Sequence, residues 1–338
     1  MRNFIFFSFF ILFIIILWNY SDENKHLIKI RGITMGNISY NIKYLNKEKI
    51  NYKSAIDSIL VDFNNSLSTY ISDSELSKFN NSDTLFNISN ELYTILKVSD
   101  KIHRSTKGAF DPTIGKLVNL WGFGPTKILE TPDSLKVRET LKNVGFNQIY
   151  FDNKIAVRNN LNIYLDFSAI AKGYAVDIIA EFLNNKNIKN FMVEIGGEVR
   201  CSGFNENKNW IIGINDPLEK NLNLPFASVS LVDRSLATSG NYRNFYKKNN
   251  VIISHTIDPR TGFSSNSNIL SASVFYKSCT EADAYATAFM VLGKNKSIEI
   301  VEKNQDLDAF LVFLDNNGNI KNYVSKGIEK HINLLKEN

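Results

Sequence analysis

The stretch FMVEIGGEVR, residues 191–200, joins two apolar runs through two neighbouring glycines. Short runs that are rich in valine, isoleucine and phenylalanine are typical of strands, and paired glycines are typical of tight turns. We therefore expect a strand, a turn and a second strand that runs back beside the first. The glycines also permit close approach of the backbone to a ligand, although a plain hairpin needs them too.

The rest of the chain contains more strand signals than helix signals. Alternating and β-branched runs predict strands at residues 31–44, 149–157, 162–167, 210–214, 226–232, 251–253, 269–275 and 309–314. Helical spacing predicts helices at residues 56–67, 91–104, 169–183 and 281–292, with a short helix between 115 and 121. Strands and helices do not alternate regularly, which favours an α+β fold with mixed or antiparallel sheets flanked by helices. A dinucleotide-binding fingerprint and a P-loop are both absent from the sequence.

The N-terminus resembles a targeting segment. Residues 4–18 are apolar apart from Ser8 and follow Arg2, which is the pattern of a signal peptide or a short membrane anchor. No small-x-small cleavage site follows, and no cysteine follows that could carry a lipid. We expect residues 1–20 to be a signal peptide or anchor, with an uncleaved anchor favoured, and residues 21–27 to be a linker. The rest of the chain would then lie outside the cytoplasmic membrane.

Charge and cysteine content limit the possible partners and disulfides only a little. The net charge is +5 over 338 residues, and lysines and arginines are scattered, so nucleic acid is not expected as a partner. The chain has two cysteines, Cys201 and Cys279. They could pair in an exported protein, or both could be buried free thiols.

Residues 279–288, CTEADAYATA, place a carboxylate and a hydroxyl one helical turn apart. Thr280 can cap the helix, and Asp283 three residues later completes a pattern that resembles a capping box. That interpretation accounts for Asp283 but not for Thr287. Alternatively, the two side chains among small alanines form a patch of hard oxygen ligands that suits Mg²⁺ or Ca²⁺.

Residues 165–177, LDFSAIAKGYAVD, predict the end of a strand and the start of a helix. Ser168 is the expected N-cap, and Lys172 lies in the first turn. Free amides at a helix start and a lysine together favour a phosphate. A routine strand-to-helix junction with an exposed lysine is the alternative interpretation.

Residues 255–262, HTIDPRTG, place an imidazole, a carboxylate, a guanidinium and two hydroxyls on one tight loop after a strand. An ordinary polar turn is the alternative. Glycines and aromatics at 108–115 and 121–124 could form a flat slot for a planar ring, or a well-packed loop. Residues 237–243 indicate a further polar turn.

Taken in this order, these segments resemble the ApbE family, the FAD:protein FMN transferases. The resemblance runs from about residue 28 to about residue 330, and we assign residues 28–335 to one such domain. The motifs that carry it are Thr34–Gly36, Leu67–Tyr70, Ser74–Ser77, Phe110–Thr113, Ser168–Asp177, Glu194–Arg200, Thr238–Gly240, His255–Gly262 and Ala282–Thr287.

The resemblance implies an α+β fold in two parts with FAD in the cleft between them. It also implies that FMN moves from FAD to a Ser or Thr of a partner flavoprotein, with release of AMP. A divalent metal, usually Mg²⁺ and alternatively Ca²⁺, would bind Asp283, Thr287 and a main-chain oxygen near Ala169. FAD would contact Met35, Tyr70, Ile71, Ser72, Asp111, Lys172 and the His255–Pro259 loop, including Ile257.

The sequence departs from the family at few positions. The family often has proline at the positions of Ser72 and Lys116, and the first of these positions lines the flavin site that the resemblance implies. The lipid-bearing cysteine of an ApbE lipoprotein is absent.

The predicted catalytic base is His255, because imidazole titrates nearest neutral pH and a hydroxyl needs a base before it attacks a phosphate. Asp258 either orients His255 or only initiates the turn, and Arg260 either holds a phosphate or pairs with a carboxylate. Two other functions use the same residues: an Mg²⁺-dependent FAD pyrophosphatase that gives FMN and AMP, and a non-catalytic FAD-binding protein.

Overall fold

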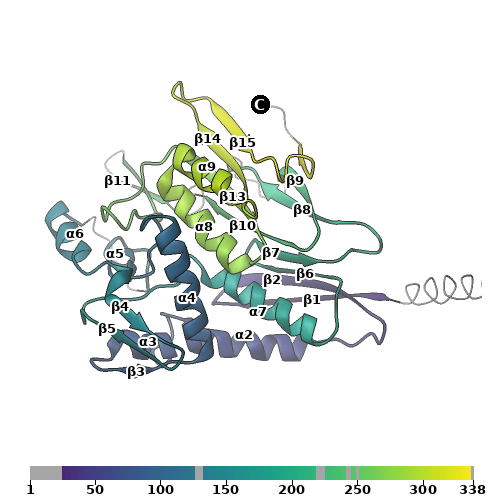
Figure 1. Ribbon diagram of the computed structural model, residues 1–338, viewed down its shortest axis with the longest axis horizontal. Helices are drawn as coiled ribbons and strands as arrows, with labels where there is room; N and C mark the ends of the chain where they lie inside the picture. Colours follow the sequence, from purple (N-terminus) through teal and green to yellow (C-terminus); the bar gives the residue numbers. More distant parts are fainter. Residues whose placement is uncertain (1–24, 126–131, 218–224, 241–244, 249–250, 336–338) are drawn as a thin grey trace, which may run out of the picture.

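An eight-stranded sheet crosses the molecule in the order β1-β2-β6-β7-β10-β13-β14-β15, and each neighbouring pair with a described register is antiparallel (Figure 1). The computed structural model describes residues 25–125, 132–217, 225–240, 245–248 and 251–335. The large sheet consists of β1 (His26–Thr34), β2 (Ile38–Asn46), β6 (Phe191–Ile195), β7 (Glu198–Ser202), β10 (Arg234–Gly240), β13 (Ile269–Tyr276), β14 (Asp308–Leu314) and β15 (Ile320–Val324). The predicted α+β class with antiparallel sheets is confirmed.

Three smaller sheets complete the strands. Their members are β3 (Phe86–Asn87), β4 (Ile149–Phe151) and β5 (Ile155–Arg158), then β8 (Trp210–Asn215), β9 (Pro225–Leu231) and β16 (Ile332–Leu334), and the hairpin β11 (Phe245–Lys248) with β12 (Val251–Ser254). The helices are α2 (Lys53–Leu67), α3 (Glu75–Asn81), α4 (Asn90–Ser105), α5 (Gly115–Leu120), α6 (Ser134–Leu141), α7 (Ala171–Asn185), α8 (Cys279–Leu292) and α9 (Lys294–Lys303).

Both faces of the large sheet are buried. Side chains alternate along a strand, so Leu236 enters one core and Ala237 enters the other. On one face α7 and α8 pack against the strands, and α2 and α4 pack on those helices in turn (Figure 1). The other face carries a core that includes residues of β8 and β9, such as Trp210 and Phe226. The ends of the strands are therefore the parts of the sheet that remain to carry polar loops.

The predicted hairpin at residues 191–200 is present. Ile195 pairs with Glu198 across a two-residue turn. Gly196 has φ +64° and Gly197 has φ +105°, a region that glycine enters without steric cost. Positive φ at both central residues matches the strand twist of a tight hairpin. This turn lies at the same end of the sheet as the turn between β1 and β2.

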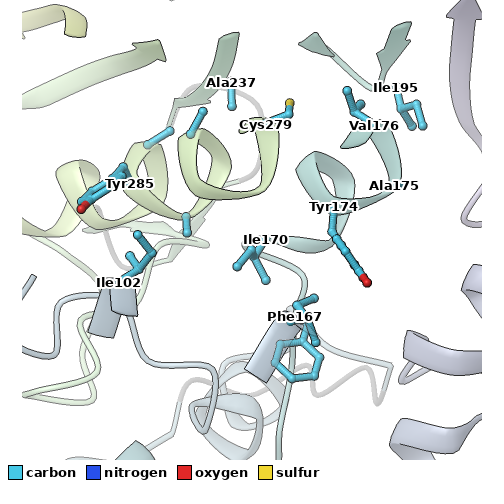
Figure 2. Close-up of a cluster of buried hydrophobic side chains, with 14 of the residues drawn as sticks. Ile102, Phe167, Ile170, Tyr174, Ala175, Val176, Ile195, Ala237, Cys279 and Tyr285 are labelled. Carbon is cyan, nitrogen blue, oxygen red and sulfur yellow. The ribbon is translucent and has the colours of Figure 1, made fainter. Parts of the chain in front are cut away.

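The contact between α7 and α8 is unusually close. A Cβ atom at Gly173 would lie 2.3 Å from the carbonyl oxygen of Cys279 and 2.8 Å from Cβ of Asp283. Figure 2 shows the two helices side by side in the core, with Val176 and Cys279 directed toward the strands. Only glycine permits this approach, which brings the first turn of α7 against the start of α8.

Asp177 of α7 fastens the start of α8. Its carboxylate accepts hydrogen bonds from the hydroxyls of Ser278 and Thr280 and from the amides of Cys279 and Thr280. Arg200 of β7 pairs with the same carboxylate at 2.9 Å. A buried acid with this many donors is fully satisfied, so Asp177 is a structural residue of the helix pair.

Both predicted helix caps are wrong. Helix α7 begins at Ala171 after Ile170, and Ser168 instead donates to Asp166 through its amide and its hydroxyl. Helix α8 is capped by Ser278, whose hydroxyl accepts from the amide of Glu281. Thr280 is turned to Asp177, so the capping pattern does not explain Asp283.

Three expected elements also differ from the structure. Residues 31–44 belong to two strands, because Met35 and Gly36 adopt positive φ of 48° and 84°. Residues 162–167 form no strand: Tyr164 makes one isolated bridge to Ile114, and the side chains of Asn80 and Arg158 bond to the backbone of Leu165 and Ile163. Residues 237–240 continue β10 and pair with β13, where a polar turn was predicted.

The two cysteines are both buried and free, so they do not pair. The predicted anchor at residues 1–20 lies outside the described residues. Within the described part of the chain, no helix is both long enough and apolar enough to span a bilayer.

The helix contact predicts the effect of Gly173→Ala. The added methyl overlaps a backbone carbonyl, which cannot move away without separating the helices, so we expect a loss of about 1–3 kcal/mol in the free energy of unfolding. Gly213→Ala is the matched control, because a Cβ there lies 3.4 Å from Pro225, an ordinary contact. Urea unfolding measures both variants. Equal stability of the two would contradict the close packing.

Candidate functional site

One end of the large sheet collects the turns that carry predicted site residues. The β1–β2 turn at Met35, the β6–β7 turn at Gly196 and the last residue of β10, Gly240, lie at this end, because neighbouring strands are antiparallel. The amide of Gly196 donates to the carbonyl of Ser39 at 3.0 Å, which joins the first two turns. We call this region the sheet end.

The first turn of α7 reaches the sheet end. A Cβ at Gly196 would lie 2.8 Å from Cγ2 of Ile38 and 3.2 Å from Cδ of Lys172. The absence of a side chain at Gly196 therefore makes room for the stem of Lys172. Lys172, predicted from the helix-start motif, is confirmed to lie in the first turn of α7.

Lys172, Glu198 and Asp283 form a buried charge cluster from three elements, α7, β7 and α8. The ammonium of Lys172 lies 2.9 Å from Oε1 of Glu198 and 3.6 Å from Oδ1 of Asp283. Both acidic side chains are 2% exposed, against 26% for Lys172. The other oxygen of Asp283 accepts a hydrogen bond from the amide of Gly173 at 3.0 Å. One of the helix-start amides is thus already bonded to Asp283.

Burial shifts the protonation equilibria of this cluster. It raises the pKa of Glu198, and the charge of Lys172 opposes this shift. Burial also raises the pKa of Asp283, again against Lys172. For Lys172, burial lowers the pKa, but the charges of Asp283 and Glu198 more than offset it and raise the pKa overall. Two acids that compete for one ammonium in a dry environment favour the arrival of further positive charge.

Thr287 lies one turn beyond Asp283 on α8 and is half-buried. Its hydroxyl is 3.2 Å from the hydroxyl of Ser239, near the end of β10. The hydroxyl of Thr287 is therefore directed toward the end of β10. Ser239 is an additional hydroxyl at this position.

The donor chemistry here fits a divalent cation. A carboxylate, a hydroxyl and the main-chain oxygen predicted near Ala169 are the hard oxygen ligands that Mg²⁺ and Ca²⁺ prefer. The buried carboxylate of Asp283 is not required as a helix cap, and the ammonium of Lys172 lies 3.6 Å from it. Within the described residues there is no group of three or more His, Cys, Asp or Glu side chains that could hold a metal. The predicted set contains only one such side chain and relies on oxygens of other kinds.

The loop from His255 to Ser265 is fixed to α8. The amide of Ser265 donates to the carbonyl of Thr256, and the hydroxyl of Ser265 donates to the carbonyl of Met290 at 2.9 Å. Met290 follows Thr287 by three residues. His255 therefore belongs to a loop that is anchored next to the helix that carries Asp283 and Thr287. Its ring is half-buried and meets Phe123 edge-on at 6.3 Å between centroids.

Trp121 holds the other end of this loop. Its indole N–H donates to the carbonyl of Gly262 at 2.8 Å. Trp121 is 6% exposed and packs with Leu117, Val137 and Ile257 in a small separate core. Of the two interpretations of residues 121–124, the structure shows the well-packed loop for Trp121. The side chain of Ile257 is buried in the same core, so only its backbone could make the predicted contact with FAD.

Asp258 and Arg260 pair with each other. The guanidinium of Arg260 donates to both carboxylate oxygens of Asp258, at 2.8 and 2.7 Å. The carbonyl of Asp258 accepts from the amide of Gly262, which closes the turn. Among the open alternatives, Arg260 thus pairs with a carboxylate, and Asp258 initiates the turn. A role of Asp258 in orienting His255 stays a prediction.

The predicted flavin residues on the loop after α2 are accessible. Tyr70 is 68% exposed and Ile71 is 36% exposed, and Ser72 beside them is exposed as well. Partial burial and the charge of Asp166 raise the pKa of the Tyr70 phenol. The Tyr70 phenol is therefore close enough to Asp166, which precedes α7, to interact with its charge. These side chains are free to contact a ligand beside α7.

Asp111 is fully engaged within the protein. Its carboxylate accepts from the amide and hydroxyl of Thr113 and from the amide of Phe146, and His103 lies 3.4 Å away. Burial raises the pKa of Asp111, against these donors. Asp111 thus shapes its loop, and its contact with FAD stays a prediction. Met35 is half-buried, in the left-handed region at φ 48°.

The family sequence model described as ApbE matches residues 35–311. The chain belongs to the ApbE family. The FAD:protein FMN transferase of Vibrio cholerae is 35% identical over 318 residues, which cover 91% of this chain and 93% of that protein. The FAD:protein FMN transferase of Haemophilus influenzae is 38% identical over 313 residues, which cover 88% and 89%. The resemblance predicted from the motifs is confirmed.

Solved structures agree with this assignment. The flavin transferase ApbE from Vibrio cholerae superposes with a TM-score of 0.80 at 33% identity and covers 91% of this chain and 99% of its own. The apo form of the Pseudomonas stutzeri flavinyl transferase ApbE gives a TM-score of 0.80 at 29% identity, with 89% and 95% covered. The ApbE fold therefore extends over nearly all of the described chain.

Two residues of this ApbE site were not predicted as site residues, Glu198 and Ser239. The motif around Glu198 predicts a hairpin whose glycines permit close approach to a ligand, but it assigns no role to the Glu198 side chain. A signal was present, because Glu198 and Arg200 share one face of β7 by strand alternation. The ion pairs of that face are with Lys172 and Asp177 of α7. No sequence pattern predicts a role for Ser239, because its contact with Thr287 exists only in the folded protein.

The anchoring of the His255 loop predicts the effect of Trp121→Phe. The variant loses the hydrogen bond to Gly262, and we expect a loss of about 1 kcal/mol in unfolding free energy and faster hydrogen exchange at the amides of Asp258 and Gly262. Trp210→Phe is the matched control, because its indole donates to Ser202 in a different core. Exchange followed by mass spectrometry measures both. Equal protection of residues 255–265 in the two variants would show that Trp121 does not anchor the loop.

Proposed function

We propose that this protein transfers FMN from FAD to a serine or threonine hydroxyl of a partner flavoprotein through a phosphoester bond, with release of AMP and with a divalent cation as cofactor. The relatives named above support an enzyme of this type. The observation that carries the proposal is that helix α8 brings the candidate metal ligands and the loop of the candidate base together. This helix bears Asp283 and Thr287, and it also anchors the loop of His255 through Met290.

The reaction exchanges the phosphoanhydride bond of FAD for a phosphoester bond to the acceptor. The acceptor hydroxyl oxygen bonds to the phosphorus of the FMN half, and the bond from that phosphorus to the bridging oxygen breaks. AMP leaves with the bridging oxygen, and the hydroxyl proton passes to His255. The diphosphate repels the incoming oxygen, so positive charge from Lys172 beside it lowers the barrier.

The cation would be held by Asp283, Thr287 and the main-chain oxygen of Ala169. When bound, Mg²⁺ or Ca²⁺ offsets charge on the diphosphate and stabilises the leaving phosphate of AMP. The exposed side chains of Tyr70, Ile71 and Ser72 support binding of the flavin ring or its ribityl chain on the same side. Met35 and the 255–259 backbone complete the proposed contacts with FAD.

We also propose that the apolar residues 4–18 place the enzyme on the outer face of the cytoplasmic membrane, as an anchor or as a signal peptide. Protease added to intact spheroplasts should then digest the protein. Digestion only after lysis would contradict this location.

His255→Ala should reduce flavin transfer by at least about 100-fold and leave FAD binding nearly unchanged, because the variant removes the base and little of the binding surface. The full chain is incubated with FAD, Mg²⁺ and a protein that carries an exposed threonine in a mobile loop. Flavin fluorescence that survives denaturing electrophoresis reports transfer. His331→Ala, at an exposed position in the C-terminal segment, is the matched control and should retain activity.

The same assay separates the alternative functions. Free FMN and AMP without labelled acceptor would favour a pyrophosphatase, and tight FAD retention without turnover would favour a binding protein. Undiminished transfer by His255→Ala would overturn the assignment of His255 as the base.

Asp283→Asn should raise the Mg²⁺ concentration needed for half-maximal transfer by more than about 100-fold. Loss of a residue that only supports a metal ligand typically costs about 10–100-fold in affinity, and loss of a ligand should cost more. The amide keeps the volume of the carboxylate but not its charge. Asp306→Asn, at an exposed site beyond α9, is the control for a general loss of negative charge. An unaltered Mg²⁺ dependence would rule out Asp283 as a ligand.

A further inference from the structure

Glu198 has a buried oxygen that the site described so far does not use. Its Oε1 pairs with Lys172, whereas Oε2 has no hydrogen-bond partner among the described residues. The side chain is 2% exposed, so water does not solvate this oxygen. An unpaired buried carboxylate oxygen is costly to stability, which points to a function for its charge.

The position of Glu198 determines where the ammonium of Lys172 lies. The ammonium is 2.9 Å from Glu198 and 3.6 Å from Asp283, so its ion pair with Glu198 is the shorter of the two. Gly196 leaves room for this arrangement, since a Cβ there would lie 3.2 Å from Cδ of Lys172 and 3.6 Å from Oε2 of Glu198. The turn at Gly196 and Gly197 thus leaves space for the ion pair of Lys172 and Glu198.

We propose that Glu198 is a positioning residue that holds Lys172 away from Asp283 and so leaves the Asp283 carboxylate open to a divalent cation. The inference rests on the proposed metal site at Asp283. Without the charge of Glu198, Asp283 becomes the only carboxylate that the structure shows within reach of Lys172. A direct ion pair then occupies the oxygen that a cation needs, and the two positive charges compete for one carboxylate.

Competition between charges makes a prediction that a merely structural role does not. Glu198→Gln should weaken binding of Mn²⁺, used as the probe metal, by about 10-fold or more, within the range for an outer-shell residue. Removing the competitor as well, in Glu198→Gln with Lys172→Met, should restore most of the affinity. Lys172→Met alone should bind Mn²⁺ at least as tightly as the unaltered protein.

Electron paramagnetic resonance of free Mn²⁺, titrated with the full chain without FAD, measures these affinities independently of turnover. Thermal unfolding of each variant verifies that it is folded. If Glu198→Gln is unfolded, Lys172→Met still tests the proposal, since weaker Mn²⁺ binding by that variant contradicts it. Unchanged affinity in Glu198→Gln, or a double variant as weak as the single one, also overturns it.

Asp283→Asn separates this inference from the proposed function. If Asp283→Asn loses Mn²⁺ binding while Glu198→Gln retains it, only the role of Glu198 is wrong. If Asp283→Asn binds Mn²⁺ as tightly as the unaltered protein, the metal site itself is wrong, and the role of Glu198 is wrong with it.

Discussion

The close contact of α7 with α8 at Gly173 is the constraint on which the candidate site depends. It brings the first turn of α7 so near to α8 that the amide of Gly173 donates to Asp283. The same approach places Lys172 beside the acids of β7 and α8. Asp177 secures the contact from one turn further along, through the start of α8. A larger residue at position 173 would separate the groups that have to act together.

The electrostatics of the charge cluster are unfavourable for stability alone. Buried ion pairs rarely stabilise a fold more than apolar residues of similar volume, because desolvation offsets their attraction. Here two buried acids share one ammonium, and one acid oxygen lacks a hydrogen bond among the described residues. Strained electrostatics of this kind concentrate at functional sites, where a substrate or cofactor completes the charge balance. The cluster and the diphosphate chemistry proposed for the family therefore complement each other.

Local sequence patterns predicted most of the fold. The alternation in β9 and the helical spacing in α4 each identified the correct element, because those segments bury a regular face. The patterns failed at residues 162–167, where Tyr164 makes one isolated bridge and the side chains of Asn80 and Arg158 bond to the backbone of Leu165 and Ile163. They also failed at β10, whose polar end becomes a strand only through its pairing with β13.

The site was predicted in part for the same reason. Lys172, Asp283 and Thr287 could be identified because each belongs to a motif with recognisable chemistry within a few residues. For Glu198 the sequence offers only the face of β7 that it shares with Arg200, because its significance comes from Lys172, 26 positions earlier in the chain, and from Asp283, 85 positions later. The same holds for Trp121, whose indole bonds to Gly262 across 141 positions. Spacing in sequence does not reveal partners that only the fold brings together.

The central claim is that the sheet end beside α7 and α8 holds the cation and the diphosphate of FAD. A crystal structure of the protein with FAD and Mn²⁺, with anomalous scattering recorded to locate the metal, tests it most directly. We expect an anomalous peak within bonding distance of the Asp283 carboxylate and the Thr287 hydroxyl, with a phosphate of FAD beside Lys172. A metal bound elsewhere, or FAD bound away from α7, would contradict it.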